Sequence, residues 1–245
     1  MITDVAQDPY ARAVWQALSR ERLSGYGGAS VPWADVLSRY LWNIALCEAT
    51  YPTLQTLEVA LRNAVFDAGC ASYPFAAPTN VGQVPCWLDT GVLLPGDRGK
   101  ISGAKARLRD AGKPLEPGRL VAELTFGFWT TLFDVRYENT RILWPRLFGQ
   151  KIFADAPKRF RNRKALSPLL NRVRHLRNRA FHHEPIWHWR DLREQHAIAM
   201  DLIGWMSPPL RETVGALDRF DAVYADGLDP FRGIVLSAAG AARAA

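Results

Sequence analysis

The sequence predicts an all-α protein. Apolar residues recur at spacings of three and four over most of the chain, as expected for helices with one buried face. Asp-Pro and Ser-Pro pairs stand where several of these patterns begin, and glycine or proline stands where they end. No stretch alternates apolar and polar residues convincingly, so no strand is expected.

Three helices are expected in the first part of the chain. Asp8-Pro9 predicts an N-cap followed by proline at the first helical position, opening a helix over residues 9–23. Pro32 opens a second helix that runs to about residue 47. A third covers residues 53–68, and Gly69 is placed to cap its C-terminus.

The segment 70–98 contains four prolines and several glycines and has no sustained period. It is expected to form a long ordered loop or an insertion in a single domain that covers residues 1–236. Helical patterns resume after it, over residues 99–111, 119–133 and 136–148.

Ser167-Pro168 repeats the capping signal and predicts a helix that stops near Glu184-Pro185. Two more helices are expected over residues 191–206 and 209–224. The small-residue tail, residues 237–245, is expected to be flexible. Trp15, Trp42, Trp129 and Trp205 stand at helical apolar positions and are expected in the core.

Composition restricts the class of protein. The 245 residues are 48% apolar, which excludes a disordered chain, and the three cysteines exclude a disulfide-stapled one. Cys47, Cys70 and Cys86 form no C-x-x-C pair and are expected to be reduced thiols. No secretory signal and no apolar run of membrane-spanning length is visible, so a cytoplasmic protein without a membrane partner is expected.

Charge is concentrated in one stretch. The chain has a net charge of +7, and residues 156–183 hold nine Lys and Arg with no Asp or Glu. Such a field predicts a polyanionic partner, in the first place RNA, although a solvated basic surface without a partner would have the same pattern. The residues expected to bind RNA are Lys158, Arg159, Arg161, Arg163, Arg172, Arg174, Arg179 and His183.

The end of this basic stretch carries candidate catalytic groups. Asn178 and His182 are four residues apart and share a helix face, whereas Arg177 lies about 140° round the helix from His182. A two-fold partner would bring two Arg and two His into one cleft. Histidine can transfer the protons of RNA cleavage by the 2′-OH, and arginine can stabilise the phosphorane, so this chemistry requires no metal or other cofactor.

Each of these residues also has a purely structural interpretation. His182 would suit a helix C-terminus, where an imidazolium is favoured by the dipole. Arg177 would pair with Glu184 or Glu58, and Asn178 would be an ordinary polar residue of a helix. A zinc site is not expected, because His183-Glu184 and His188 lack the spacing of a zinc-binding helix and Pro185 would break that helix.

The order of several motifs resembles a known family. Arg177-Asn178-x-x-x-His182 resembles the R-x(4–6)-H motif of HEPN domains. Three blocks over residues 10–205 resemble the Abi-like (abortive infection) proteins: Leu57-Glu58-x-x-Leu61-Arg62-Asn63-Ala64-Val65 preceded by Tyr40-x-Trp42-Asn43, Glu123-Leu124-x-Phe126-Gly127-Phe128-Trp129-x-x-Leu132-Phe133, and Leu176-Arg177-Asn178-Arg179-x-x-His182-His183-Glu184.

This resemblance implies a HEPN-like helical bundle with additional helices, a homodimer, and a metal-independent endoribonuclease that acts in phage defence or as a toxin. Arg177 and His182 would then be the catalytic pair and Asn178 the orienting residue, with His183 as a substitute or supporting group. Glu58 and Arg62, four residues apart, would form a structural salt bridge.

Two alternatives remain open from the sequence. The same fold would serve as a non-catalytic RNA-binding module, or as a toxin held silent by an antitoxin or another regulatory protein. Trp187 and Trp189 flank His188 beside the basic stretch, and would either stack on an unpaired base or pack on the bundle as a lid.

Overall fold

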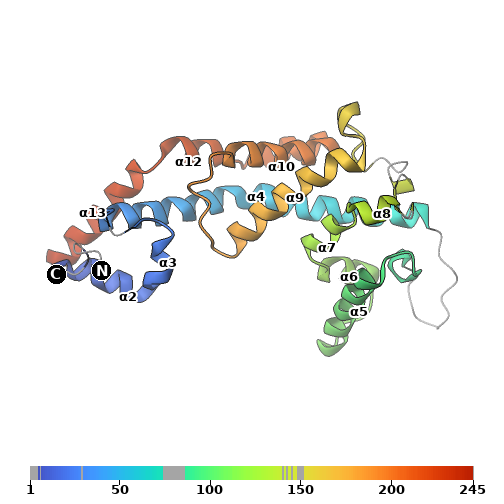
Figure 1. The fold of residues 1–245 in the computed structure, drawn as a ribbon, viewed down its shortest axis with the longest axis horizontal. Coiled ribbons are helices and arrows are strands. Elements are labelled where there is room, and N and C mark those ends of the chain that lie inside the picture. The colour runs from blue at the N-terminus through green and yellow to red at the C-terminus, as the bar shows by residue number, and fades with distance from the viewer. Residues whose placement is uncertain are drawn as a thin grey trace. The chain divides into compact units, whose positions relative to one another are not determined.

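A computed structural model describes residues 5, 7–28, 30–73, 86–139, 141, 143–144, 146–147 and 152–244 (Figure 1). All regular secondary structure in these residues is helical, which confirms the all-α prediction. The α-helices are α2 (Pro9–Leu18), α3 (Arg20–Ser24), α4 (Trp33–Ser72), α5 (Pro95–Asp110), α6 (Pro117–Glu123), α7 (Phe126–Thr131), α8 (Val135–Asn139), α9 (Arg163–Phe181), α10 (Leu192–Met206), α11 (Pro208–Gly215), α12 (Phe220–Asp226) and α13 (Asp229–Ala244).

The chain divides into two compact units. Unit 1 comprises Met1–Pro52, Leu176–His196 and Leu217–Ala245, and unit 2 comprises Thr53–His175 and Ala197–Ala216. The units interleave along the chain, so the division does not fall in the segment 70–98. The single domain expected over residues 1–236 stays a prediction.

The first helix begins as predicted. The Asp8 side chain accepts hydrogen bonds from the backbone N–H groups of Tyr10 (2.9 Å) and Ala11 (3.3 Å), as an N-cap does. The prediction of one helix to residue 23 is wrong, because Ser19 has a φ of 68° and ends α2. The Ser19 hydroxyl then caps the short α3 by accepting from the Arg22 N–H at 3.2 Å.

Helix α4 replaces the two helices predicted over residues 32–68. It is continuous for 40 residues and contains Pro52 in its interior (Figure 1). A proline removes one backbone hydrogen bond and usually interrupts a helix. Here buried residues continue on both sides of it, including Leu46, Leu54 and Leu57, so burial of the apolar face outweighs the local signal.

Gly69 also differs from its predicted role as a helix cap. It lies inside α4, against the indole ring of Trp87. A Cβ atom at this position would stand 2.1 Å from Trp87 Cε2, so the packing requires glycine. Trp87 itself is fully buried and opens the short 3₁₀ helix η1 (Trp87–Asp89).

Helix α9 begins earlier than predicted. Asn162 Oδ1 accepts the Ala165 N–H at 2.9 Å, in the manner of an N-cap, and Pro168 lies within the helix. The Ser167-Pro168 cap prediction is therefore wrong. The end of α9 agrees with the predicted stop near Glu184-Pro185, since the last helical residue is Phe181.

Helix α10 agrees with the pattern predicted over 191–206, whereas several other patterns are divided or shifted. The pattern over 119–133 divides into α6 and α7, and that over 209–224 into α11 and α12. Helix α5 begins inside the segment predicted as a loop, and residues 74–85 of that segment lie outside the described residues. Of the four tryptophans expected in the core, Trp129 is fully buried, whereas Trp15, Trp42 and Trp205 are half-buried.

Unit 1 has its own hydrophobic cluster, to which α13 contributes. Val235 and Ala239 of α13 are buried in it, and Arg243 makes an ion pair with Asp8. The expected flexible tail is thus helical through residue 244, and Ala239 is the one buried residue among its described positions. The buried members of the cluster are Val5, Ala11, Leu23, Tyr26, Trp33, Val36, Leu37, Val235 and Ala239.

Unit 2 is built around buried aromatic side chains. Trp129 and Phe128 are in edge-to-face contact at 5.0 Å, and Trp144 donates its indole N–H to the Leu132 carbonyl at 2.8 Å. Among the described residues, no helix is both long and apolar enough to cross a membrane.

Candidate functional site

The C-terminus of α9 turns sharply at two histidines. His183 adopts the left-handed conformation with a φ of 60°. The Glu184 N–H bonds to the Arg179 carbonyl at 2.8 Å, and the His183 N–H bonds to the Ala180 carbonyl at 3.2 Å. These are the bonds of a Schellman motif, in which the left-handed position is usually glycine. The turn leaves the side chains of His182 and His183 exposed.

The segment after this turn is fixed by one buried side chain of α4. Asn43 is 2% exposed, and its Oδ1 accepts the backbone N–H groups of Ile186 (2.7 Å) and Trp187 (3.1 Å). Two of the blocks that carry the family resemblance, Tyr40-x-Trp42-Asn43 and Leu176–Glu184, thereby lie close together in unit 1. Asn43 therefore holds the backbone a few residues beyond His182 and His183.

Trp187 packs against other residues of unit 1. Its indole N–H donates to the Gly25 carbonyl at 3.3 Å, and the Arg39 guanidinium lies 5.0 Å from its ring centroid. Its ring is also 6.5 Å from that of Trp42. Of the two roles considered for Trp187, these contacts fit packing rather than base stacking.

The two histidines line an open pocket in unit 1, which we call the His182 pocket. Its volume is about 610 Å³, within the range of sites that bind small molecules or single nucleotides. Its walls come from α2, α3, the following turn, the first half of α4 and the end of α9. The lining residues are Ala17, Leu18, Arg22, Tyr26, Tyr40, Asn43, Ile44, Cys47, His182 and His183.

Burial keeps two groups in the wall of the pocket neutral. It raises the pKa of Tyr26 to about 12 and that of the Cys47 thiol to about 11, although the nearby Arg22 charge opposes both shifts. The Tyr26 hydroxyl is buried and has no hydrogen-bond partner among the described residues. Arg22 is the one lining residue of the pocket with a permanent charge.

Arg177 is not among the residues that line this pocket. Its guanidinium lies 4.5 Å from the ring centroid of Phe181, and that ring stacks on Tyr51 at 5.3 Å. Asn178 is exposed one turn before His182, and its carbonyl accepts the His182 N–H at 2.9 Å. Within one chain, the predicted catalytic arginine and histidine are therefore not brought into the same pocket.

Arg179 and Glu184 make an ion pair at the end of α9. The Arg179 guanidinium also lies 5.9 Å from the ring centroid of Trp189. Glu184 is one of the two partners expected for Arg177, and its carboxylate makes this ion pair with Arg179. A pair between Arg177 and either Glu184 or Glu58 stays a prediction. Arg179, expected to bind RNA, is thus held beside its own helix end.

Other basic residues expected to bind RNA lie in unit 2. Lys158, Arg159 and Arg161 are exposed, and Arg172 and Arg174 are half-buried on α9. Arg161 Nε donates to the Ala156 carbonyl at 2.6 Å.

Arg163 differs from these residues, because it is only 8% exposed. It is held by Glu138 (2.6 Å) and by the Phe133 carbonyl (3.2 Å), so it stabilises the fold of unit 2 and does not suit a surface that binds RNA.

Glu58 and Arg62, expected as a structural pair, are half-buried one turn apart on α4 in unit 2. The Arg62 Nε is a buried nitrogen without a hydrogen-bond partner among the described residues. Their salt bridge stays a prediction.

Sequence reasoning missed Arg22, Tyr26 and Cys47 as neighbours of His182. No spacing in the sequence connects them with α9, because more than a hundred residues separate the two segments. For Asn43 the sequence did indicate importance, because this residue lies in a block that carries the family resemblance. Its role as the acceptor that fixes the 184–190 segment could not be derived from that block.

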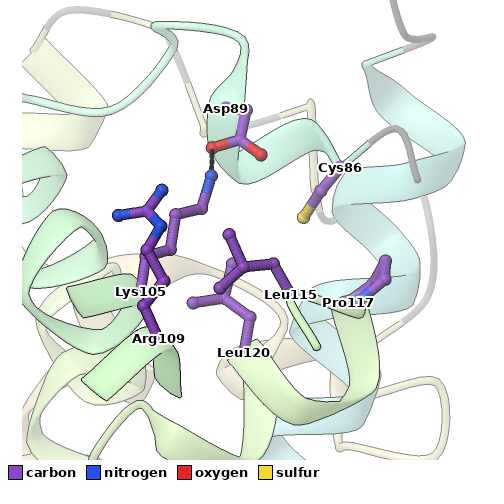
Figure 2. Close-up of a pocket in the computed structure, with 7 residues that line it drawn as sticks. All are labelled: Cys86, Asp89, Lys105, Arg109, Leu115, Pro117 and Leu120. Carbon is purple, nitrogen blue, oxygen red and sulfur yellow. Dashed lines mark hydrogen bonds and ion pairs between the residues drawn. The ribbon is translucent and has the colours of Figure 1, made fainter. Parts of the chain in front are cut away.

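A second, smaller cavity lies in unit 2 (Figure 2). Its volume is about 40 Å³, which is room for a few water molecules. Lys105 and Asp89, two of its lining residues, form an ion pair (Figure 2). Burial raises the pKa of the Cys86 thiol, also in the lining, to about 11. This cavity is too small for a nucleotide, so the His182 pocket is the candidate site.

In the part of the chain that the structure describes, no three His, Cys, Asp or Glu side chains gather where they could hold a metal ion. No protein-family model, curated protein or solved structure matches the chain.

Proposed function

We propose that the chain is a metal-independent endoribonuclease of the HEPN type and that the His182 pocket is its active site. One observation carries this proposal. The exposed His182 and His183 share an open pocket with the permanent charge of Arg22, at the end of a basic helix. The sequence resemblance to Abi-like proteins supports the same function.

The reaction would use the RNA's own 2′-hydroxyl group as the nucleophile. His182 removes its proton, the 2′-oxygen bonds to phosphorus, and the bond from phosphorus to the 5′-oxygen breaks. A protonated imidazole, from His183 or from a second copy of His182, gives a proton to the leaving oxygen. Positive charge stabilises the phosphorane, and the products are a 2′,3′-cyclic phosphate and a 5′-hydroxyl.

The proposal includes a homodimer with a HEPN-like bundle, in which two copies of Arg177, Asn178 and His182 line one cleft. A dimer is needed because Arg177 and His182 of one chain do not line a common pocket. Light scattering should then give twice the chain mass of 27.5 kDa. A monomer that cleaves RNA at full rate would remove the role given to Arg177.

Cleavage is tested with a labelled single-stranded RNA in the presence of EDTA. We expect a 2′,3′-cyclic phosphate product, which is lost in His182→Ala. The matched control is His175→Ala, which removes an exposed imidazole from the same helix outside the pocket. Equal cleavage by the wild-type and His182→Ala proteins would refute the nuclease proposal.

A role in phage defence or as a toxin predicts a difference in cells. Expression of the wild-type protein should arrest growth, whereas His182→Ala should not. If arrest requires removal of a second protein encoded beside this one, that protein is the proposed antitoxin. Growth arrest by both the wild-type and the His182→Ala protein would mean that the toxicity does not depend on the His182 pocket.

A second candidate is a non-catalytic RNA-binding module. The exposed side chains of Lys158, Arg159 and Arg161 in unit 2 favour it, since phosphate contacts need no catalytic group. It predicts RNA binding that weakens with salt and declines stepwise as single basic residues are replaced. Binding without any product, in the wild-type protein, would favour this candidate.

A further inference from the structure

We propose that Arg22 is the phosphate-binding residue of the His182 pocket and contacts the phosphodiester group on which His182 acts. The inference rests on the proposed function for the identity of the ligand as RNA. It adds a residue of α3 to a site that the sequence motif places on α9 alone. Three features of the pocket carry it.

The first feature is the charge of the lining. The ten lining residues include one arginine and two histidines, and none is Asp or Glu. The nearest acidic residue in sequence, Glu21, is exposed and lies outside the lining. Hydrogen bonds with its own backbone and with the Ser19 side chain lower the pKa of Glu21, and the charge of Arg20 adds to this effect. The positive charge of Arg22 is therefore not cancelled within the pocket.

The second feature is the environment of the guanidinium. Arg22 is half-buried, and among the described residues its side chain has no hydrogen bond or ion pair. A guanidinium has five N–H donors in a fixed fork that matches the oxygens of a phosphate. Partial removal from water without a partner costs free energy, which an anionic ligand would offset.

The third feature is the neutrality of the groups around it. Arg22, Tyr26 and Cys47 line the same pocket, and the positive charge of Arg22 acts to lower the pKa of both neighbours. Burial nevertheless keeps both groups protonated at neutral pH, so neither supplies a counter-charge. The buried Tyr26 hydroxyl without a partner adds a polar group to the same wall.

Binding is measured by fluorescence anisotropy with a 2′-O-methyl RNA oligonucleotide, which the enzyme cannot cleave. Arg22→Gln should weaken binding by roughly tenfold, the loss of one charge-assisted hydrogen bond. It should also lower the slope of log affinity against log salt by about 1. Arg20→Gln is the matched control, because Arg20 is an exposed arginine of α3 outside the lining, and it should change binding less than twofold.

A second measurement locates the guanidinium independently of RNA cleavage. Bound oligonucleotide should protect Cys47 from alkylation, as followed by peptide mass mapping. Without RNA, Arg22→Gln should shift the alkylation of Cys47 to higher pH, because the neighbouring positive charge is lost. Arg22→Lys keeps the charge and should leave the pH dependence of Cys47 alkylation close to that of the wild-type protein. Its affinity for the oligonucleotide should lie between those of the wild-type protein and Arg22→Gln.

The outcomes separate this inference from the proposed function. If Arg22→Gln and Arg20→Gln bind the oligonucleotide equally well, Arg22 is not the phosphate-binding residue, whether or not His182→Ala abolishes cleavage. If Arg22→Gln loses binding and the wild-type protein cleaves no RNA, the phosphate site stands and the nuclease proposal fails. Should Arg22→Gln not fold, as judged by its urea midpoint, Arg22→Lys and the protection of Cys47 decide.

Discussion

The guanidinium of Arg177 lies over the ring of Phe181, 4.5 Å from its centroid. Phe181 stacks in turn on Tyr51 of α4, with a ring separation of 5.3 Å and an interplanar angle of 17°. The arginine of the R-x(4–6)-H motif thus contacts an aromatic pair, and it is not among the residues that line the His182 pocket.

The contact between Arg177 and Phe181 predicts a measurable coupling. Arg177→Ala and Phe181→Leu should each destabilise the fold, and the double variant should lose less than the sum by about 0.5–1 kcal/mol, since a cation–π contact at a partly exposed site has about that strength. Urea unfolding of the four proteins gives the coupling free energy. Strict additivity would mean that the two side chains do not stabilise each other.

Asn43 is expected to contribute more to the free energy of unfolding than the contact between Arg177 and Phe181. Asn43→Ala removes the acceptor of the Ile186 and Trp187 N–H groups and should lower the free energy of unfolding by about 2–4 kcal/mol. The control is Asn63→Ala, an exposed residue of the same helix, which should change stability by less than about 0.5 kcal/mol. Chemical denaturation compares the two, and equal losses would contradict the role of Asn43.

The left-handed backbone of His183 predicts a stabilising substitution. His183→Gly removes the Cβ atom that makes a φ of 60° unfavourable, and should raise the melting temperature through a gain of about 0.5–1 kcal/mol. The control is His188→Gly. His188 has no positive φ to relieve, so this substitution should destabilise the protein. A loss of stability in His183→Gly would show that contacts of the imidazole stabilise the fold by more than the strain of the positive φ costs.

Alkaline pH should weaken unit 1. Burial raises the pKa of Cys47 from 9.0 to about 11 and that of Tyr26 from 10.0 to about 12. The unfolded chain releases these protons first, so the stability they contribute is complete below pH 9 and is lost as pH rises toward 11 and 12. The urea midpoint should therefore fall between pH 9 and 11, and less steeply in Cys47→Ala. An identical slope in both proteins would exclude a contribution from Cys47.

The sequence predicted the helical class and several helix ends, because these depend on local chemistry. Asp8 caps α2 and α9 stops before Pro185 for reasons that lie within a few residues. The prediction divided α4 between residues 47 and 53 and began α9 at Ser167-Pro168, yet both helices continue through an interior proline because their apolar faces continue on both sides of it. Propensity is a weak signal where burial is strong.

The residues of the candidate site also differ in whether local sequence could identify them. His182 was identified from the basic stretch and the motif, and it is exposed in an open pocket. Arg22 was not identified, because its nearness to His182 comes from packing between segments far apart in the chain. Arg163 was assigned to RNA from its place in a run of basic residues, and its burial beside Glu138 is a tertiary feature that the run does not contain.

The hydrophobic cluster of unit 1, which includes Tyr26, joins Val5 and Ala11 to Val235 and Ala239. Two segments more than two hundred residues apart in the sequence therefore close over the same side chains. A truncation that ends before α13 should uncover Ala11 and Tyr26, and with Tyr26 one wall of the His182 pocket.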